Sequence, residues 1–322
     1  MIGFILFFAW LGFGADLILY LATQAAEPGE YRHVVPWFGI AVTAVVAIAA
    51  LNAYKTGPQK VLWAAGAREI TIPQTDAERQ LVNVVEEMAI AAGVSKPRVW
   101  IIPDDDPNAF ATGLDPQNAH VSVTLGLLAV CSRDELQGVI GHELGHIKNL
   151  DVRLMTTLAA LVGAILLMRD GMGRILRHGR LPGLGGSSRK GKSDAGPLIA
   201  ILVTLWIVSW IFAPIITQVL AIAVNRKREF LADAMSAQFT RNPLALASAL
   251  EKIEAAGGGG PTASIKRGSA HLCIVDPLGR RLTNREGWLA DRLATHPPLS
   301  MRVSLLKGMG YAQLKQEGGL AV

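Results

Sequence analysis

"GHELGHIKNLD" (residues 141–151) places two histidines four positions apart, with a glutamate directly after the first. Four residues make about one turn of an α-helix, so His142 and His146 point to the same side and can bind one metal ion. Glu143 lies beside them, where a carboxylate can take a proton from a water molecule on the metal. The alternative is an ordinary polar helix face, because so short a pattern also occurs by chance.

The residues before this stretch predict that it is helical. Ser132 followed by Glu135 is a capping box, which marks a helix N-terminus. Apolar residues then recur at helical spacing and should face a core, namely Leu136, Val139, Ile140 and Leu144. Gly141 and Gly145 leave room beside the two histidines. A capped, amphipathic helix with this open side favours the metal site over chance.

A catalytic zinc site needs a third protein ligand and one open position. The extended pattern with a third histidine is absent, because Asn149 and Val152 occupy the places of its glycine and histidine. Glu229 in "NRKREFLAD" is the best candidate, and Asp233 lies one turn later on the same helix face, where it can orient a ligand histidine. Spacing alone leaves open a surface ion pair between Glu229 and a neighbouring basic residue.

Long apolar segments predict an integral membrane protein. Residues 2–23 carry Asp16 as their only charge, and residues 34–53 follow after a short link, which predicts a retained transmembrane hairpin. Residues 198–224 are uncharged and long enough to cross a bilayer. Residues 154–168 are shorter than the roughly 20 that a crossing needs. This segment is therefore either a short membrane crossing or a helix buried against residues 198–224, and the sequence leaves both alternatives open.

Basic residues beside the apolar segments predict the orientation of the chain in the membrane. They place the polar region 55–152 and the C-terminal third in the cytoplasm, and they are Lys55, Lys60, Arg68, Arg153, Arg226, Lys227 and Arg228. The basic loop 169–192 argues the other way if both later segments cross, and the sequence leaves that conflict open.

The polar regions predict a mixed fold, α+β and mainly helical. Three strand-like runs suggest a small antiparallel meander, at 98–103, 108–113 and 120–125, after a short strand at 68–73. Helices are expected from Thr75 to about Ala92, through 228–239, from about Pro243 to Ala256 and from about Leu299. The resulting division is an N-terminal hairpin (1–54), a catalytic region (55–153), a second hydrophobic hairpin with a flexible basic loop at 169–197 (154–224), and a second catalytic region (225–322).

The cysteine spacing and the lack of nucleic-acid-binding signatures limit the kinds of site and partner expected for this protein. Cys131 and Cys273 lie far apart without CxxC spacing, which predicts free thiols. No RNA- or DNA-binding signature is present, so we expect no nucleic-acid partner.

Four stretches together resemble the HtpX-type membrane zinc endopeptidases, which are relatives of the CAAX prenyl endopeptidases. They are "GHELGHIKNLD", "NRKREFLADA", "NAFATG" (108–113) and "THPPLSMR" (295–302), and the resemblance extends over nearly the whole chain. It implies a zincin-like catalytic domain in which His142, His146 and Glu229 bind one zinc ion. It also implies Glu143 as the general base and Asp233 behind a ligand histidine.

The same resemblance assigns roles outside the metal ligands. "NAFATG" is expected to be the edge strand that pairs with the substrate backbone, with Asn108 and Ala109 as substrate contacts. His296 is expected to stabilise the oxyanion, with Arg302 nearby. Taken alone, Asn108 would be a turn residue after Pro107, and His296 would be a loop residue.

The resemblance implies a multi-pass enzyme of the bacterial cytoplasmic (inner) membrane. Its expected function is cleavage of misfolded or damaged membrane proteins, or of unfolded polypeptides, on the cytoplasmic side, in overlap with other membrane proteases. The short separation between the metal motif and the next apolar segment agrees with this function. If one helix continues from His146 to Leu154, the zinc lies only about 12 Å from the apolar segment. A CAAX-type processing peptidase and a non-enzymatic membrane scaffold are the alternatives.

Overall fold

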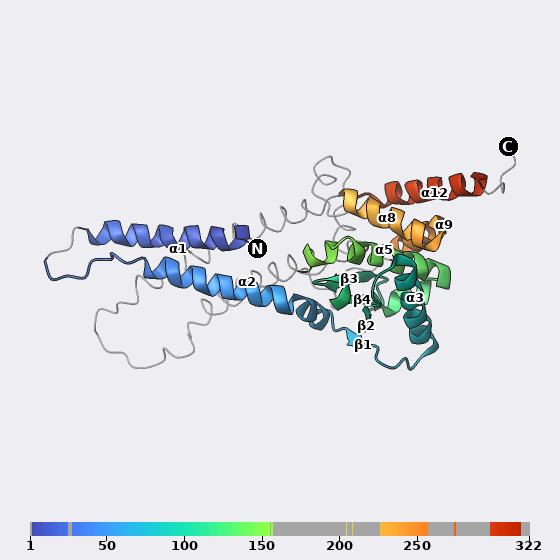
Figure 1. Cartoon of the computed structure of the whole chain (residues 1–322), viewed down its shortest axis with the longest axis horizontal. Coiled ribbons are helices and arrows are strands. Elements are labelled where there is room, and N and C mark those ends of the chain that lie inside the picture. Colours follow the sequence, from blue (N-terminus) through green and yellow to red (C-terminus); the bar gives the residue numbers. More distant parts are fainter. Residues whose placement is uncertain are drawn as a thin grey trace. The chain divides into compact units, whose positions relative to one another are not determined.

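The computed structural model describes residues 2–24, 28–154, 226–256 and 297–316, together with four single residues, Thr156, Thr204, Val208 and Ile274. Most of the predicted segments 154–168 and 198–224, the basic loop, Cys273 and His296 lie outside the described residues. The chain divides into two compact units, Met1–Gly57 and Pro58–Val322 (Figure 1).

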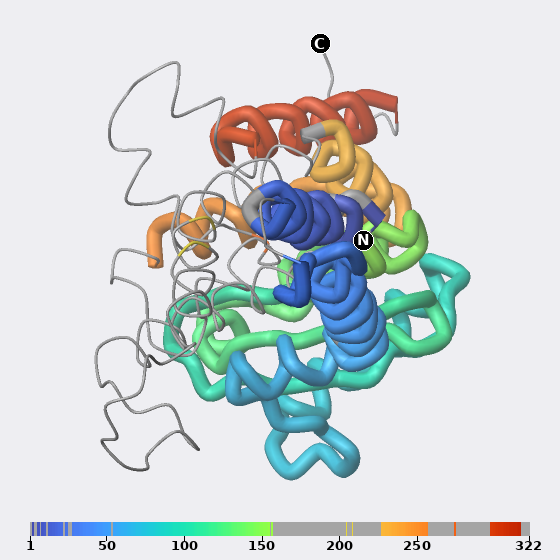
Figure 2. Tube along the Cα trace, turned by 90° about the vertical axis from the view of Figure 1, so that its left-hand side faces the viewer, coloured from blue at the N-terminus to red at the C-terminus, as the bar shows by residue number. Residues whose placement is uncertain are grey.

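The first unit contains two apolar helices, α1 (Ile2–Thr23) and the first part of α2 (Trp37–Ala64). They approach closely, because a Cβ atom at Gly12 would lie 2.9 Å from the Cα of Gly39 (Figure 2). Asp16, the one charge of α1, is buried between them. It makes a 2.6 Å hydrogen bond with His33 and accepts the Gly39 N–H near the start of α2, so this carboxylate caps the second helix.

In the described part of the chain, no single helix has both the length and the apolar composition to cross a membrane. Two pieces of α2, Trp37–Asn52 and Tyr54–Ala64, meet at 60° and satisfy both conditions only together. Phe8–Leu21 within α1 is apolar but shorter.

The second unit is mainly helical around a small sheet. Its strands are β1 (Arg68–Glu69), β2 (Arg98–Ile102), β3 (Ala109–Gly113) and β4 (Ala119–Thr124), in the order β1-β2-β4-β3. Strands β2 and β4 are parallel, whereas the other pairs are antiparallel.

The predicted antiparallel meander is therefore wrong. In a meander β2 would pair with β3, but β4 lies between them and β3 is at the edge. The loop after β2 does not close a hairpin, because the Asp104 carbonyl accepts a hydrogen bond from Gly126 N–H beyond the end of β4 (2.9 Å). This bond connects the loop to α4 (Leu125–Val130), and β4, not β3, pairs with β2.

The predicted helices of the second unit are confirmed. Thr75 caps α3 (Asp76–Ala92), and Ser132 and Glu135 form the predicted capping box of α5 (Arg133–Lys148). The other predicted helices are α8 (Arg226–Thr240), α9 (Pro243–Ala256) and α12 (Leu299–Gln316). A short 3-10 helix that was not predicted, η1 (Pro116–Asn118), precedes β4. One sheet face packs in a continuous core with α3, α5 and α9, whereas Phe110 and Ile102 face Val61 and Leu62 of α2.

A row of glycines lets two helices approach α5. A Cβ at Gly145 would lie 3.2 Å from the Cα of Ala232 in α8, and a Cβ at Gly138 would lie 2.9 Å from the backbone N of Leu246 in α9. At Gly141 the neighbour would be the Ser236 hydroxyl of α8, 3.0 Å away. The helices stack closely here (Figure 2), so the first turn of α8 lies beside the histidines of α5.

The helix of the motif does not run on to Leu154. It ends at Lys148, Leu150 adopts the left-handed conformation (φ 61°), and a new helix starts at Asp151. The condition on which the estimate of about 12 Å rests, one continuous helix from His146 to Leu154, is therefore not met. Asn149 N–H still makes the ordinary helical hydrogen bond to the Gly145 carbonyl, whereas Leu150 N–H donates to the Ile147 carbonyl three residues back, which closes a turn.

Candidate metal centre and active site

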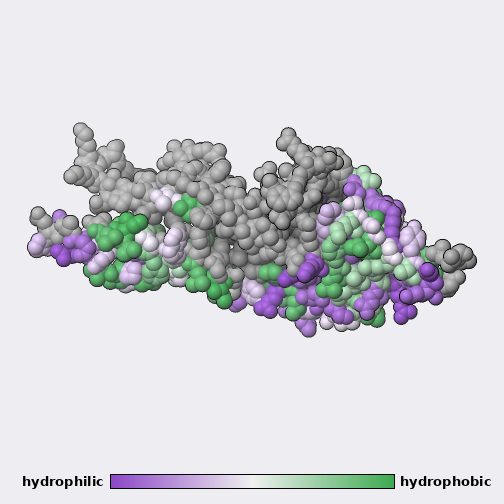
Figure 3. Space-filling model, turned by 90° about the horizontal axis from the view of Figure 1, so that it is seen from above, coloured by the Kyte–Doolittle hydropathy of each residue, from purple (hydrophilic) through white to green (hydrophobic). Residues whose placement is uncertain are grey.

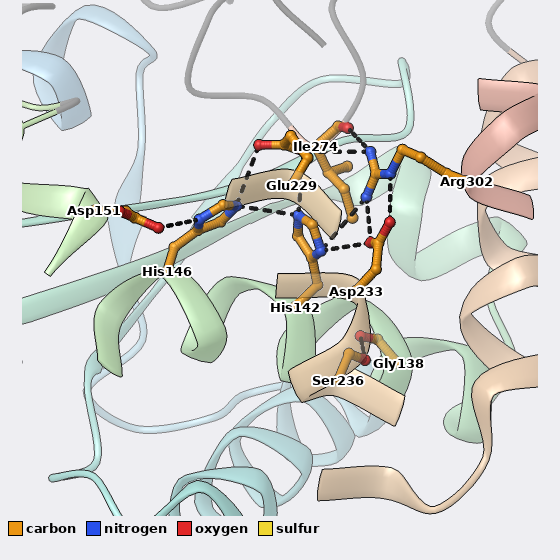
Figure 4. A network of polar contacts seen from close by, with 9 residues as sticks. All are labelled: Gly138, His142, His146, Asp151, Glu229, Asp233, Ser236, Ile274 and Arg302. Carbon is orange, nitrogen blue, oxygen red and sulfur yellow. Dashed lines mark hydrogen bonds and ion pairs between the residues drawn. The ribbon is translucent and has the colours of Figure 1, made fainter. Parts of the chain in front are cut away.

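Three side chains from two helices meet at one point (Figure 4). The Nε2 atoms of His142 and His146 are 3.2 Å apart, and the Glu229 carboxylate oxygens lie 3.7 and 3.5 Å from them. The ligand atoms of all three residues fall within 4.8 Å of one another. Ligands about 2.1 Å from a tetrahedral ion are roughly 3.4 Å apart, so this spacing suits a single metal ion.

His142 is oriented by a buried ion pair. Its Nδ1 lies 2.9 Å from Asp233 Oδ1, and Arg302 donates to both oxygens of Asp233, from Nε at 2.8 Å and from Nη2 at 2.7 Å. A carboxylate at Nδ1 accepts the proton of that nitrogen, so Nε2 keeps its lone pair toward the ligand cluster. Asp233 thus occupies the place expected for it, and Arg302 fixes Asp233.

His146 is oriented by a second carboxylate. Asp151 Oδ2 lies 3.3 Å from His146 Nδ1, and Asp151 Oδ1 lies 3.1 Å from Arg228 Nη1. The sequence reasoning missed Asp151 although the residue closes the quoted motif. On a continuous helix, a side chain five positions after His146 would point away from it, and only the turn at Leu150 brings it back.

Glu143 is placed to act as a base. Its side chain is buried, which raises the pKa of the carboxyl to about 7, while His146 and the N–H of Ala111 act in the opposite direction. A carboxylate with a raised pKa holds a proton more firmly than an exposed one, as a general base at neutral pH requires.

The charges of the site fit a divalent cation. Burial would raise the pKa of Asp233, but Arg302 outweighs it and lowers that pKa to about 2. Burial also opposes the charge on His146, yet the carboxylates of Asp151, Glu229 and Glu143 raise its pKa to about 9. The cluster contains four buried carboxylates, those of Glu143, Asp151, Glu229 and Asp233, and one buried guanidinium, that of Arg302. This excess of buried negative charge favours a dication, and two imidazoles with a carboxylate suit zinc among several transition metals.

Of the two predicted substrate contacts, Ala109 is the first residue of the edge strand β3 and Asn108 directly precedes it. The Asn108 side chain is buried, and its Oδ1 accepts the Ala109 N–H at 3.0 Å. The carbonyl of Ala109 accepts the N–H of Ile274 at 2.9 Å, and Arg302 Nη1 donates to the Ile274 carbonyl at 3.0 Å. Ile274 is therefore held between β3 and Arg302 by backbone hydrogen bonds, as a residue of an added strand would be. No sequence signal pointed to Ile274.

Two imidazoles one helical turn apart, a carboxylate from a second helix and a buried glutamate between them define a metallopeptidase of the HExxH class. The comparisons with known proteins agree with this class. The description "Peptidase family M48" matches residues 75–310, and the chain belongs to that family as an HtpX-type metalloprotease.

Several relatives share most of their length with this chain. A protein named "Protease HtpX homolog" from Thermoanaerobacter pseudethanolicus is 42% identical over 259 residues, which cover 80% of each chain. A homologue of the same name from Dictyoglomus turgidum is 37% identical over 303 residues, 94% of this chain and 90% of that protein. Among solved structures, S. mikatae Ste24p matches with a TM-score of 0.46 and 19% identity, over 94% of this chain and 64% of that one.

Proposed function

We propose that this metalloprotease is a zinc-dependent endopeptidase of the bacterial cytoplasmic membrane, which cleaves misfolded or damaged membrane proteins on the cytoplasmic side. The observation that carries the proposal is the cluster of His142, His146 and Glu229 beside Glu143, on a chain that also contains long apolar segments.

The protein groups divide the chemistry among them. Zinc, when bound, supplies a Lewis acid that polarises the scissile carbonyl and acidifies water. Glu143 takes the proton of the attacking water and passes it to the leaving amine. Asp233 and Asp151 keep Nε2 of each histidine available as a ligand. Stabilisation of the oxyanion by His296 stays a prediction from the resemblance.

The surface of the first unit supports a membrane location. Large apolar side chains are exposed on both of its helices, where hydrophobic colour gathers in Figure 3. They include Trp10 (71% exposed), Ile18 (68%), Val45 (65%) and Ile48 (68%). Such an extended apolar surface is unfavourable in water and favourable against lipid. Lys55 and Lys60 follow this apolar surface, as is typical of a cytoplasmic flank.

The backbone groups on the outer edge of β3 favour unfolded polypeptides as substrates. The carbonyl of Ala109 and the backbone of Ala111 face the outer edge of β3, on the side of Glu143. A peptide that adds to a sheet edge must be extended along its length, a state that misfolded segments provide and compact domains do not. Because Ile274 already bonds to the Ala109 carbonyl, a substrate strand would pair from Ala111 or replace Ile274 at Ala109.

The first test is proteolysis by the full chain, purified in detergent with a chelator present to limit self-cleavage. A reduced, unfolded model protein is incubated with wild type, Glu143→Gln and Glu86→Gln, with added zinc or with chelator. Glu86 is an exposed surface residue, so its variant controls for the loss of a glutamate charge. We expect zinc-dependent cleavage by wild type and Glu86→Gln and none by Glu143→Gln, although Glu143→Gln still binds zinc. Equal cleavage by all three proteins would contradict the proposal.

The second test addresses substrate and side. In inverted membrane vesicles, a reporter membrane protein with destabilised loops on both sides is cleaved by wild type, and the new termini are mapped by mass spectrometry. Cuts confined to cytoplasmic loops are expected. Cuts confined to the opposite loops would refute the orientation, and exclusive cleavage of prenylated peptides offered in parallel would favour the CAAX-type alternative.

A further inference from the structure

We propose that Asp151 is a positioning residue for the metal site and that Arg228 holds it in place. The inference rests on the proposed function, since it takes His146 to be a metal ligand. It gives the last residue of the "GHELGHIKNLD" motif a role in that site.

Asp151 joins the two helices that supply the ligands. One carboxylate oxygen lies 3.3 Å from Nδ1 of His146, and the other lies 3.1 Å from Nη1 of Arg228. Arg228 directly precedes Glu229, so the carboxylate connects a ligand on α5 to the turn of α8 that carries the third ligand. Asp151 is only 6% exposed, and the His146 side chain is 16% exposed, so their contact is largely shielded from water, whereas the Arg228 side chain is 37% exposed.

The backbone at this point is strained in a way that serves Asp151. Leu150 has φ 61°, a left-handed conformation that is unfavourable for a residue other than glycine. Its own side chain is 48% exposed and gains little from burial. The turn at Leu150 is stabilised by the two residues that follow it. Asp151 reaches His146, and Val152 is buried in the core. A strained turn persists when its neighbours depend on it.

The chemistry follows from the position of the carboxylate. By accepting the Nδ1 proton, Asp151 selects the tautomer of His146 whose Nε2 lone pair faces the ligand cluster, and its negative charge makes that nitrogen a better donor. Arg228 fixes the Asp151 rotamer through the second oxygen. The arrangement parallels Asp233 and Arg302 behind His142, so each ligand histidine has a carboxylate and an arginine behind it.

The test measures metal affinity directly. Wild type, Asp151→Asn, Asp151→Ala, Arg228→Gln and the double variant Asp151→Ala/Arg228→Gln are titrated with zinc against a competing chelator. Asp134→Asn is the matched control, since Asp134 is an exposed carboxylate on the same helix α5. Cobalt(II) absorption spectra report the ligand geometry, and thermal unfolding of the metal-free proteins reports the fold.

We expect Asp151→Ala to raise the zinc Kd about 10–100-fold, the usual effect of removing such a partner. Asp151→Asn should raise it less, because its amide oxygen still accepts the Nδ1 proton. Arg228→Gln should weaken binding a few-fold, with no further loss when it is combined with Asp151→Ala. Asp134→Asn should match wild type. The cobalt spectrum should change in Asp151→Ala while metal-free stability changes little.

The outcomes separate this inference from the proposed function. If wild type binds zinc and Asp151→Ala binds it within twofold with an unchanged cobalt spectrum, the inference is refuted and the proposed function stands. Wild type that binds no metal would refute both. If Asp151→Ala fails to fold, Asp151→Asn and Arg228→Gln decide, and wild-type affinity in both would refute the inference.

Discussion

The pKa of a single carboxyl group, Glu143, determines how the activity should depend on pH. Burial raises this pKa to about 7, and a general base must be ionised to accept a proton. Activity therefore falls as pH drops through the pKa of Glu143. A bound dication favours the ionised form, so the acidic limb of kcat/KM should lie below pH 7 in the zinc-loaded enzyme. A pH–rate profile checks this, and a limb above pH 7 would contradict it.

Substitution of Asp233 should reduce both the stability of the protein and its affinity for zinc. Asp233→Asn removes the carboxylate that accepts two hydrogen bonds from the fully buried Arg302 and leaves Glu229, 3.5 Å from Nη1, as its ion-pair partner. Breaking such a buried pair costs about 3–5 kcal/mol of unfolding free energy. It also weakens the orientation of His142, so the zinc Kd should rise about 10–100-fold. Chemical denaturation and zinc titration measure the two effects.

A second variant separates these two effects. Adding Arg302→Met to Asp233→Asn removes the buried guanidinium, so part of the stability should return while zinc affinity stays low. Recovery of affinity together with stability would show that Asp233 acts only through the fold.

At the scale of elements, the glycine row of α5 sets the distance between the ligand helices. A Cβ in Gly145→Ala would lie 3.2 Å from a backbone atom of Ala232, so α8 must shift by a few tenths of an ångström and Glu229 moves with it. We expect weaker zinc binding and a lower Tm. Gly308→Ala is the control, because a Cβ there meets nothing within 4 Å; it should stabilise α12 by about 1 kcal/mol. Equal behaviour of the two variants would refute the packing argument.

The capping box of α5 should make stability depend on pH. Burial would raise the pKa of Glu135, but hydrogen bonds from Lys252, Ser248 and the Ser132 N–H lower it below its ordinary value. The stabilisation is therefore present above the ordinary pKa and is lost as pH falls through the lowered one. Glu135→Gln should have a lower Tm than wild type at pH 7, and the difference should shrink below about pH 4.

An exposed ion pair provides the comparison for Glu135. Glu86 pairs with Lys96 at the surface, so Glu86→Gln should change the Tm little at either pH. A constant Tm difference for Glu135→Gln across the pH range would show that packing, and not charge, is lost in that variant.

At the scale of the whole molecule, the three ligands lie in the unit Pro58–Val322, so metal should stabilise that unit. At a free zinc concentration of 1,000 times Kd the gain is about 4 kcal/mol. Chelation should lower the unfolding temperature of this unit, and hydrogen exchange should increase in α5 and α8 but not in α1. Equal loss of protection in α1 would contradict the division into two units.

Local patterns in the sequence were enough to predict many features of this protein. The capping residues Thr75 and Ser132 predicted where two helices begin, because a cap depends on residues three positions apart. Helical spacing predicted the two histidines on one face, and the four motifs together predicted the family. In these cases the physical information lies within one turn or one short segment.

Only the tertiary structure decided what depends on chain reversals and long-range packing. The order of the strands depends on which distant segments pair, and the parallel pairing of β4 with β2 is not contained in any alternation pattern. The role of Asp151 depends on the left-handed turn at Leu150, since a continuous helix would point it away from His146. The placement of Ile274 against Ala109 and Arg302 joins segments far apart in sequence. A sequence pattern records local conformational preference, whereas these contacts depend on how distant segments pack around a shared core.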